Sequence, residues 1–557
     1  MNSNHLQMGD HSYSRFACLS CSSSSSVKLL IFMAPFIVLL GFVFVLDPTK
    51  LNYLPVSTSL HSSSASATNY GAKDSDDGVV VELGASGLVM IEDHRTAEAE
   101  GLNSSEASVV NQTSSSLLPA VDDDQDRQLT DTKTERNKEE TTVTTNGTSS
   151  PTDSLLNESH ANPMKPNRET VRTSLQRLEA GLQRARAAIK EASISGYHPL
   201  EDPDYVPIGP IYRDAKAFHR SYLEMEKQFK IYVYKEGEPP LFHDGPCRSI
   251  YSMEGNFIHK IETNKQFRTN NPEKAHVFYL PFSIVKMVRF VYDRNSRDFA
   301  PIKNTVVDYI NLVAGRYPYW NRSLGSDHLM LSCHDWGPEA SFSHPYLFKN
   351  SIRALCNANT SEKFNPTKDV SIPEINLQTG ELTGLLGGPS PSRRPILAFF
   401  AGGVHGPIRP VLLEHWEDKD EDIKVHKYLP KGVSYHDMMR NSKFCICPSG
   451  YEVASPRIVE ALYSGCVPVL ISVDYVPPFN DVLNWKSFSV EVSVEDIPNL
   501  KKILLGISSR QYIRMHRRVL LVRRHFEFNS PPKRFDVFHM ILHSVWLRRL
   551  NVRVLGG

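Results

Sequence analysis

The stretch from Phe444 to Ser472, FCICPSGYEVASPRIVEALYSGCVPVLIS, has the pattern of a strand, a turn, a helix and a second strand. Phe444–Cys447 is a short apolar run that ends at a Pro-Ser-Gly turn, and Val467–Ile471 is a second run rich in branched residues. Between them, Pro456 suits the first turn of a helix. The stretch therefore predicts a βαβ unit.

The expected helix of this unit has polar residues at helical spacing. Arg457, Glu460 and Ser464 recur on one side of it. Free N–H groups at the helix start, with Arg457 beside them, favour a diphosphate, and Glu460 could accept hydrogen bonds from a ribose diol. The alternative is an ordinary βαβ crossover whose Arg and Glu form a surface pair.

Further motifs accompany this unit in a fixed order along the chain. They are Tyr232–Lys235, Phe267–Thr269, Ala275–Tyr279, Tyr317–Arg322, Asp327-His328 and His334–Gly337. Together, from about residue 225 to about residue 545, they resemble the exostosin-type glycosyltransferases, specifically the plant branch known as family 47. The resemblance implies an α/β, GT-B-like fold with two Rossmann-like domains facing a cleft, and a Golgi enzyme that uses a nucleotide sugar and inverts the anomeric centre.

The N-terminal part predicts a membrane anchor. Residues 29–46 form an uncharged apolar run of 18 residues, long enough to cross a bilayer. Because Asp47 follows directly, without a small-residue cleavage site, we expect an uncleaved signal-anchor rather than a cleaved signal peptide. Residues 1–28 would be a cytosolic tail and the rest lumenal, as in a type II Golgi membrane protein. Acceptor sequons after the run agree with this orientation, at Asn103, Asn111, Asn146, Asn157, Asn321 and Asn359.

Residues 47–167 are rich in Ser, Thr, Asn and Asp, with almost no aromatic residues, and predict a disordered, glycosylated stem. Residues 168–195 then carry a heptad pattern, through Val171, Leu175, Leu178, Leu182, Ala185 and Ile189. Two interpretations remain open for this helix. It packs on the catalytic body, or it forms a coiled coil that makes a homodimer or a complex with related transferases.

Six cysteines follow the predicted anchor, and an even lumenal count permits disulfides. The sequence does not assign the pairs, because six cysteines allow fifteen connectivities. Cys445 and Cys447 are too close together, and too poorly accompanied, for a zinc site. We expect buried thiols or a disulfide partner there.

The first half of the body, residues 225–388, is expected to hold the acceptor. Lys230–Tyr234, His276–Pro281 and His328–Ser332 have the pattern of buried strands, and Val306–Val313 that of a helix. The strand His328–Ser332 is followed by a loop that carries His334 and Asp335. This loop lies at the carboxyl end of the strand, where open α/β sheets bind ligands. The candidates for the base of an inverting transfer are His334 and Asp335, with Glu254 and Asp327 as weaker candidates. The alternative is that His334 and Asp335 form a structural hydrogen-bonded corner.

The second half, residues 389–525, is expected to hold the donor, after a Gly-, Ser- and Pro-rich linker at Gly384–Pro391. A predicted strand at Pro395–Phe400 leads into Ala401–Arg409, a loop of small residues that suits close approach to a ligand. A plain glycine turn is the alternative for this loop. The predicted donor-binding residues are Arg409, Ser449, Gly450, Tyr451, Ser455, Arg457 and Glu460. Residues 526–557 predict a C-terminal helix with one apolar face that packs back on the first half.

Charge and metal-binding patterns narrow the partners. Lys+Arg and Asp+Glu each number 62, so no polyanion-binding surface is indicated and nucleic acid is excluded as an expected partner. Asp202-x-Asp204 and the acidic run Asp418–Asp422 have the spacing of a manganese motif, but neither follows an apolar strand. We therefore assign no metal ligands and expect no required cofactor, while a role for a divalent metal stays open.

These patterns and the resemblance together predict a Golgi glycosyltransferase. It would transfer a sugar, with inversion, from a nucleoside diphosphate donor, in the first place UDP, to a cell-wall or cell-surface polysaccharide. The alternative is a carbohydrate-binding scaffold that partners an active transferase without catalysis. The donor sugar, the acceptor and the linkage depend on loop shape and do not follow from these motifs.

Overall fold

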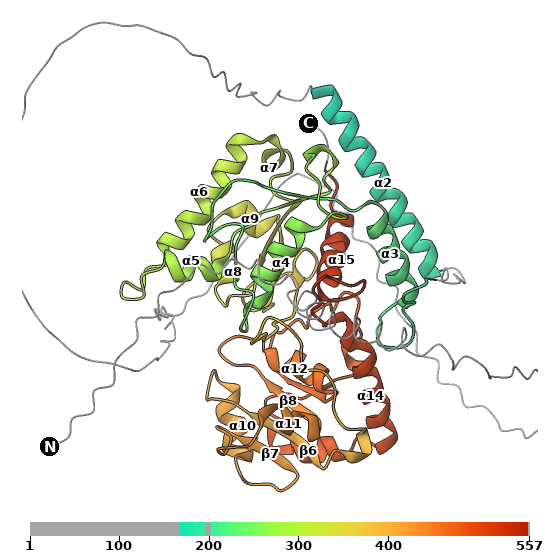
Figure 1. The fold of residues 1–557 in the computed structure, drawn as a ribbon, viewed down its shortest axis with the longest axis vertical. Coiled ribbons are helices and arrows are strands. Elements are labelled where there is room, and N and C mark those ends of the chain that lie inside the picture. Colours follow the sequence, from blue (N-terminus) through green and yellow to red (C-terminus); the bar gives the residue numbers. More distant parts are fainter. Residues whose placement is uncertain (1–167, 195–201, 555–557) are drawn as a thin grey trace, which may run out of the picture. The chain divides into compact units, whose positions relative to one another are not determined.

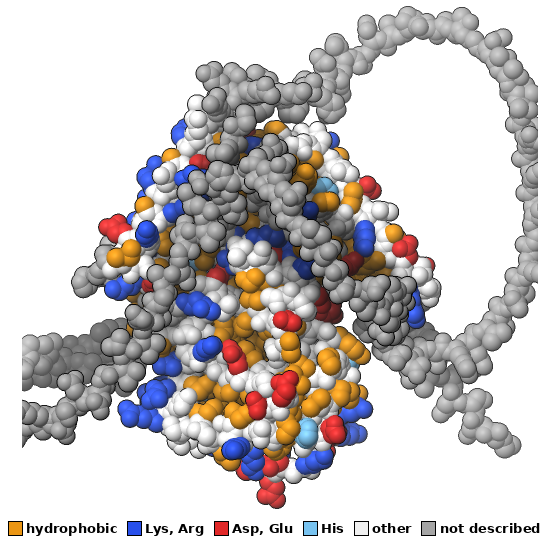
Figure 2. All heavy atoms as spheres, turned by 180° about the vertical axis from the view of Figure 1, so that it is seen from behind, with side chains coloured by type: hydrophobic (Ala, Val, Ile, Leu, Met, Phe, Trp, Pro, Cys, Tyr) orange, Lys and Arg blue, Asp and Glu red, His pale blue; other side chains and the backbone are white. Residues whose placement is uncertain are grey.

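The computed structural model describes residues 168–194 and 202–554 (Figure 1). The predicted anchor, the predicted stem and the first four sequons lie outside these residues. Among the residues that are described, no helix is long and apolar enough to span a bilayer. On the face seen in Figure 2, basic and acidic side chains are interspersed with apolar ones.

The first half of the body is built on a parallel five-stranded sheet. The strands follow chain order: β1 (Ile231–Val233), β2 (Val277–Tyr279), β3 (His328–Ser332), β4 (Ile352–Leu355) and β5 (Val370–Ser371). All of their residues are buried, which explains why each strand is a nearly continuous apolar run in the sequence. The helices of this half are α3 (Ala215–Gln228), α4 (Ser252–Thr263), α5 (Ile284–Phe290), α6 (Ala300–Arg316), α7 (Pro318–Ser323), α8 (Gly337–Ser341) and α9 (Pro345–Lys349).

The second half contains another parallel five-stranded sheet, in the order β10-β9-β8-β6-β7. Its strands are β6 (Ile396–Ala401), β7 (Ile423–His426), β8 (Ser442–Pro448), β9 (Val467–Ile471) and β10 (Val490–Glu491). Its helices are α10 (Ile408–Trp416), α11 (Tyr435–Asn441), α12 (Pro456–Ser464), α13 (Leu500–Leu505) and α14 (Ser509–Val522). The strand order reverses between β6 and β8, and such a switch point opens a binding position at the carboxyl ends of the two strands.

The predicted α/β class with parallel sheets is confirmed. The opening stretch of the sequence forms β8, α12 and β9, and β8 pairs in parallel with β9 through Phe444↔Val467 and the residues that follow. Pro456 is the first residue of α12. These elements form where the sequence predicts them because hydrophobic period and turn residues agree locally.

The C-terminal helix α15 (Val537–Leu550) packs against α3, β4 and β5 of the first sheet's half, as expected (Figure 1). The prediction of a single apolar face is wrong, because every residue from Val537 to Val545 is buried. Polar residues are accommodated by hydrogen bonds: Arg549 Nε donates to the carbonyl of His276 at 2.8 Å, and Arg548 Nε to that of Asp369 at 2.9 Å.

Helix α2 (Arg168–Ile194) carries the heptad residues and packs against α3 and α15 (Figure 1). Leu175, Leu182 and Ala185 are buried within the chain. Because the body already covers these side chains, the structure favours the interpretation of α2 as a packing element over that of a coiled coil.

Two disulfides join neighbouring elements. Cys333, just after β3, is bonded to Cys356, just after β4, and Cys445 in β8 is bonded to Cys466, immediately before β9. Cys447 is a buried thiol on the same strand as Cys445. The sequence left both pairings open.

Candidate active site

Two loops meet at the carboxyl ends of β6 and β8. Gly406 has φ +67°, and a Cβ built on it would lie 1.8 Å from the carbonyl oxygen of Gly450. The small residues of the first loop are therefore needed for contact with the second loop, as well as for any ligand. This contact brings the starts of α10 and α12 together.

Arg457 is the second residue of α12 and reaches back to the first loop. Its Nη2 donates to the carbonyl of Ala401 at 3.1 Å and its Nη1 to Ser455 Oγ at 3.3 Å. The guanidinium lies over the Phe400 ring, 4.8 Å from the centroid. Burial opposes its charge, but Tyr435 and Glu460 outweigh burial and raise the pKa of Arg457. The cation is thus retained at this position.

Arg409, the second residue of α10, is only 9% exposed. Its Nη1 donates to the carbonyl of Gly403 at 3.3 Å, and its Nε is buried without a partner among the described residues. Burial, and then the neighbouring charge of Arg457, lower the pKa of Arg409 to about 10. Two like charges held so close are stabilised by an anion between them, and a diphosphate has the charge to fit.

Two further polar atoms beside the two loops are buried without a partner among the described residues. Ser449 is 6% exposed, and its Oγ has no partner within the described part of the chain; Arg457 Nε is in the same situation. Ser455 is the N-cap of α12, but its side chain makes no capping bond. At the start of α12, Pro456 has no N–H and the N–H of Ile458 donates to the carbonyl of Ser455 at 3.2 Å, which leaves the Arg457 N–H and the helix dipole for an anion.

Tyr451 and Glu460 flank this position. Tyr451 is 57% exposed, and its ring centroid lies 5.3 Å from that of His405. Glu460, one turn into α12, accepts from Tyr435 OH at 3.0 Å and from Asn376 Nδ2 at 3.3 Å. Asn376 belongs to the first half of the body, so Glu460 contacts that half.

The loop after β3 carries His334 and Asp335. His334 Nδ1 accepts from the backbone N–H of Trp336 at 3.0 Å, and burial lowers the pKa of His334 to about 4. Burial raises the pKa of Asp335, while a hydrogen bond with Tyr251 opposes the rise. Because Nδ1 is occupied as an acceptor, the neutral His334 ring carries its proton on Nε2 and has no free nitrogen to accept one, so the hydrogen bonding favours Asp335 as the base.

Glu254, predicted as a weaker candidate for the base, is placed differently. It is fully buried, and its carboxylate accepts hydrogen bonds from Ser332 Oγ, Ser283 Oγ and the backbone N–H groups of Val285, Cys333 and His334, at 2.6–3.2 Å. A carboxylate with five donors and no exposure cannot take a proton from a substrate. It holds the His334 loop in place instead.

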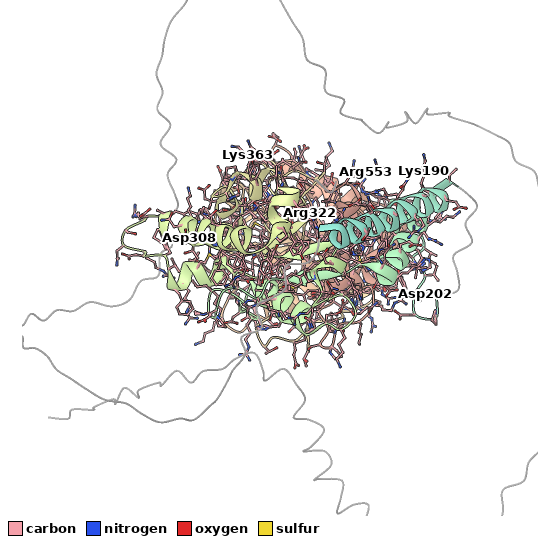
Figure 3. All side chains as sticks on the ribbon, turned by 90° about the horizontal axis from the view of Figure 1, so that it is seen from above. Lys190, Asp202, Asp308, Arg322, Lys363 and Arg553 are labelled. Carbon is pink, nitrogen blue, oxygen red and sulfur yellow. A yellow bond between two sulfur atoms is a disulfide. The ribbon has the colours of Figure 1, made fainter. Side chains whose placement is uncertain are left out.

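Asp327, the other weaker candidate, is also structural. It is 1% exposed and pairs with Arg322 at 3.1 Å and with His328 Nδ1 at 2.8 Å. Arg322, on α7, is labelled in Figure 3. Burial tends to raise the pKa of Asp327, but His328 and Arg322 outweigh it and hold the pKa well below its usual range. Such a carboxylate is a poor base.

The sequence did not indicate a set of carboxylates near Asp335. Glu374 lies three residues after β5 and is 8% exposed. Burial and the charges of Asp335 and Glu460 raise its pKa, and the charges of Arg457 and Arg409 oppose the rise. The only signal in the sequence was a charged residue shortly after a short apolar strand. Glu362 of the first half and Glu452 of the second half both accept a hydrogen bond from Asn357 Nδ2, at 3.0 Å and 2.5 Å.

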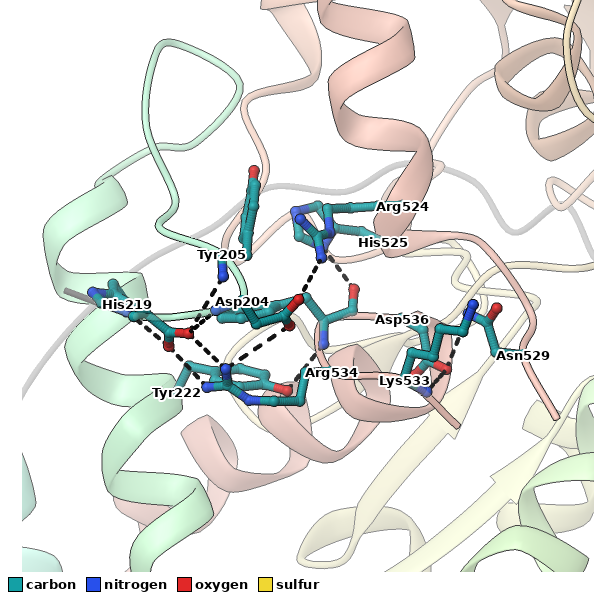
Figure 4. Close-up of polar contacts among 12 residues, drawn as sticks. Asp204, Tyr205, His219, Tyr222, Arg524, His525, Asn529, Lys533, Arg534 and Asp536 are labelled. Atoms are coloured by element: carbon teal, nitrogen blue, oxygen red, sulfur yellow. Dashed lines mark hydrogen bonds and ion pairs between the residues drawn. The ribbon is translucent and has the colours of Figure 1, made fainter. Parts of the chain in front are cut away.

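The two Asp-x-Asp motifs are occupied by ion pairs. Asp202 accepts from Arg534 Nη1 at 2.7 Å and from Arg534 Nη2 at 2.9 Å, and Asp204 lies near Arg524 (Figure 4). In the acidic run, Lys501 pairs with Asp420 and Asp422. In residues 168–194 and 202–554, no group of acidic, His or Cys side chains has the geometry to hold a metal ion.

Two of the predicted glycosylation sequons lie in the described body. Asn321 is exposed on α7, where its Nδ2 donates to the carbonyl of Ala314 at 3.0 Å. Asn359 is 8% exposed, and its side chain bonds with Glu362 and Ser361. The fold therefore leaves room for a glycan at Asn321 but not at Asn359.

The family model of the exostosin GT47 domain matches residues 225–507, which include both sheets and every candidate residue above. The chain belongs to this family. The predicted family and the predicted enzyme class, a glycosyltransferase, are thus confirmed.

One relative matches nearly the whole chain, and more distant relatives match just over half of it. A probable glycosyltransferase of Arabidopsis thaliana is 64% identical over 539 residues, 97% of each chain. A probable beta-1,4-xylosyltransferase of the same plant is 26% identical and covers 57% of this chain and 82% of its own. A probable glucuronosyltransferase of Oryza sativa subsp. japonica is 28% identical and covers 57% and 81%.

Solved structures resemble the exostosin-family chain only distantly. A glycosyltransferase from Rickettsia africae is 9% identical, covers 56% of this chain and 96% of its own, and has a TM-score of 0.28. MurG from Acinetobacter baumannii is 12% identical, covers 41% and 75%, and has a TM-score of 0.22.

Proposed function

We propose that this chain is an inverting glycosyltransferase with a GT-B arrangement, which transfers a sugar from a UDP-sugar to a plant cell-wall polysaccharide. The observation that carries the proposal is the convergence of buried, unpartnered polar atoms at the ends of β6 and β8: Arg409 Nε, Arg457 Nε and Ser449 Oγ. The start of α12 lies at the same place. An anionic diphosphate satisfies all of them.

The second half would bind the donor. Arg409, Arg457 and the positive dipole end of α12 would stabilise the diphosphate, both when bound and as it leaves with an added negative charge. Because these groups supply the positive charge, the proposal needs no metal for departure of the leaving group. Tyr451, which is largely exposed, would stack on the uracil, and Glu460 would accept from the ribose hydroxyls.

The first half would hold the acceptor and perform the proton transfer. Asp335 removes the proton of the acceptor hydroxyl as the oxygen forms a bond to the anomeric carbon. The bond from that carbon to the diphosphate oxygen breaks on the opposite side, which inverts the centre. Glu254 keeps the backbone of His334 fixed, and Tyr251 orients Asp335.

Cellular location belongs to the same proposal. The apolar run at residues 29–46 supports a signal-anchor that places the body in the Golgi lumen. Protease treatment of intact microsomes should leave the body undigested, and glycosidase treatment should lower its apparent mass. Digestion of the body without detergent would mean that the topology is reversed.

The proposal is tested by incubating wild-type and Arg457→Ala protein with a panel of radiolabelled UDP-sugars and plant polysaccharide acceptors. Wild-type protein should transfer label from at least one donor, or hydrolyse it slowly, and the variant should be far less active. A wild-type chain that neither binds UDP nor hydrolyses any donor would support the non-catalytic scaffold instead.

A further inference from the structure

Three aromatic side chains gather beside the loop that carries the proposed base. Trp336 directly follows Asp335 and precedes α8. Its ring centroid lies 4.9 Å from that of Tyr292, which follows α5, and 5.2 Å from that of Phe299, which precedes α6. This aromatic cluster of Trp336, Tyr292 and Phe299 therefore forms where the end of α5 meets the starts of α6 and α8 (Figure 1).

Ring contacts connect the aromatic cluster to the surroundings of the base. The Trp336 ring lies 5.5 Å from that of His334, and the His334 ring lies 4.9 Å from that of Tyr251. The Tyr251 hydroxyl hydrogen-bonds to the Asp335 carboxylate. The proposed base is therefore next to a continuous set of rings, which extends to the exposed residues 293–298.

The aromatic cluster is partly open to solvent. Trp336, Tyr292 and Phe299 are each half-buried, and they pack against the core of the first half. The indole N–H of Trp336 has no hydrogen-bond partner within residues 168–194 and 202–554. Lys303 and Glu339, which pair at 2.9 Å, border the cluster with exposed polar groups, and Lys303 Nζ lies 5.5 Å from the centroid of the Phe299 ring. The cluster thus combines aromatic surface with free polar groups at its edge.

We infer that the aromatic cluster binds a sugar unit of the acceptor chain, a pyranose with equatorial hydroxyls such as glucose or xylose. The two faces of such a ring consist of C–H groups, which pack on aromatic side chains. Its hydroxyls point outward from the ring, where the indole N–H of Trp336 donates to one of them. The inference rests on the proposed function and names a subsite for its acceptor, next to Asp335.

The test measures oligosaccharide binding to full-length protein saturated with UDP. Xylohexaose and cellohexaose are titrated by calorimetry, and tryptophan fluorescence is recorded on the same samples. Wild-type protein should bind at least one of the two. Because the sugar then lies against the Trp336 indole, binding should change the emission of the wild type, and Trp336→Phe should lose that change.

A second variant tests the neighbouring ring with a matched control. Tyr292→Leu keeps an apolar side chain and removes the aromatic face. It should weaken binding of the hexasaccharide about two- to tenfold, the fold-change that corresponds to one aromatic contact. Tyr346→Leu is the control, because this exposed tyrosine of α9 precedes the amino end of β4, at the opposite edge of the sheet from Trp336. Its affinity should equal that of the wild type.

The outcomes separate the subsite from the proposed function. Wild-type protein that binds UDP but neither hexasaccharide would overturn the inference, and so would a fluorescence change that persists in Trp336→Phe. Equal affinities of Tyr292→Leu and Tyr346→Leu would also overturn it. UDP affinity should be unchanged in all three variants, which shows that they are folded. Failure of the wild type to bind UDP would instead remove the proposed function.

Discussion

The proposed donor half and the proposed acceptor half position their polar groups in different ways. Arg409 and Arg457 each follow a strand of one sheet and begin the next helix, so a short stretch of chain positions each of them. Asp335 and Glu374 instead depend on contacts between segments far apart in the sequence, such as the hydrogen bonds from the His334 loop to Glu254. The donor side is thus defined locally and the acceptor side by tertiary packing.

The largest expected effect comes from changing the proposed base, because this change should affect turnover but not donor binding. Asp335→Asn should lower turnover by about 10²–10⁴-fold, the contribution of general base catalysis, while UDP affinity stays nearly unchanged. Initial rates with saturating donor measure this. Asp308→Asn, on an exposed position of α6 (Figure 3), is the matched control. Near-normal turnover of the Asp335 variant would remove this residue from catalysis.

A second change tests whether packing holds the acceptor loop. Glu254→Gln keeps the shape of the side chain but replaces one accepting oxygen by a donor, facing groups that also donate. Because a buried unsatisfied group costs about 1–3 kcal/mol, unfolding by denaturant should occur at lower concentration. Turnover should fall with UDP affinity retained. A variant of unchanged stability would contradict the positioning role.

The smallest expected effect concerns pH and the contact between the halves. The folded protein raises the pKa of Glu452 from 4.5 to about 8, so it binds more protons than the unfolded chain between these values. Stability contributed by this group is therefore present at low pH and is lost as pH rises through about 8. Thermal unfolding measured from pH 5 to pH 9 should show a decline that is smaller in Glu452→Gln. The exposed control Glu495→Gln should behave as the wild type.

The same contrast explains what the sequence could predict. The strand His328–Ser332 and the βαβ unit from β8 to β9 form as expected, because each is set by local hydrophobic period and turn residues. The predicted donor residues of the two loops converge at one place. Their positions followed from being next to strand ends in a parallel sheet.

The roles of residues that depend on tertiary packing could not be predicted from the sequence. Asp327 was a polar residue in a motif and Glu254 a polar residue outside the motifs. Nothing in the sequence distinguished a buried carboxylate, such as Glu254 with its five hydrogen bonds, from a base. Glu374 was missed because its neighbours Asp335 and Arg457 are distant in the chain. Helix α15 was expected to bury one apolar face, but it is buried on all sides, because arginines such as Arg549 bond to backbone carbonyls.

The most direct test of the account is a calorimetric titration of UDP into wild-type, Arg457→Ala and Asp335→Asn protein. The loss of a charge-assisted hydrogen bond predicts that Arg457→Ala weakens binding by about 1.5–3 kcal/mol. Asp335→Asn should bind as the wild type does, and so should Arg510→Ala, an exposed control on α14. Normal UDP binding by Arg457→Ala would contradict the donor site at the ends of β6 and β8.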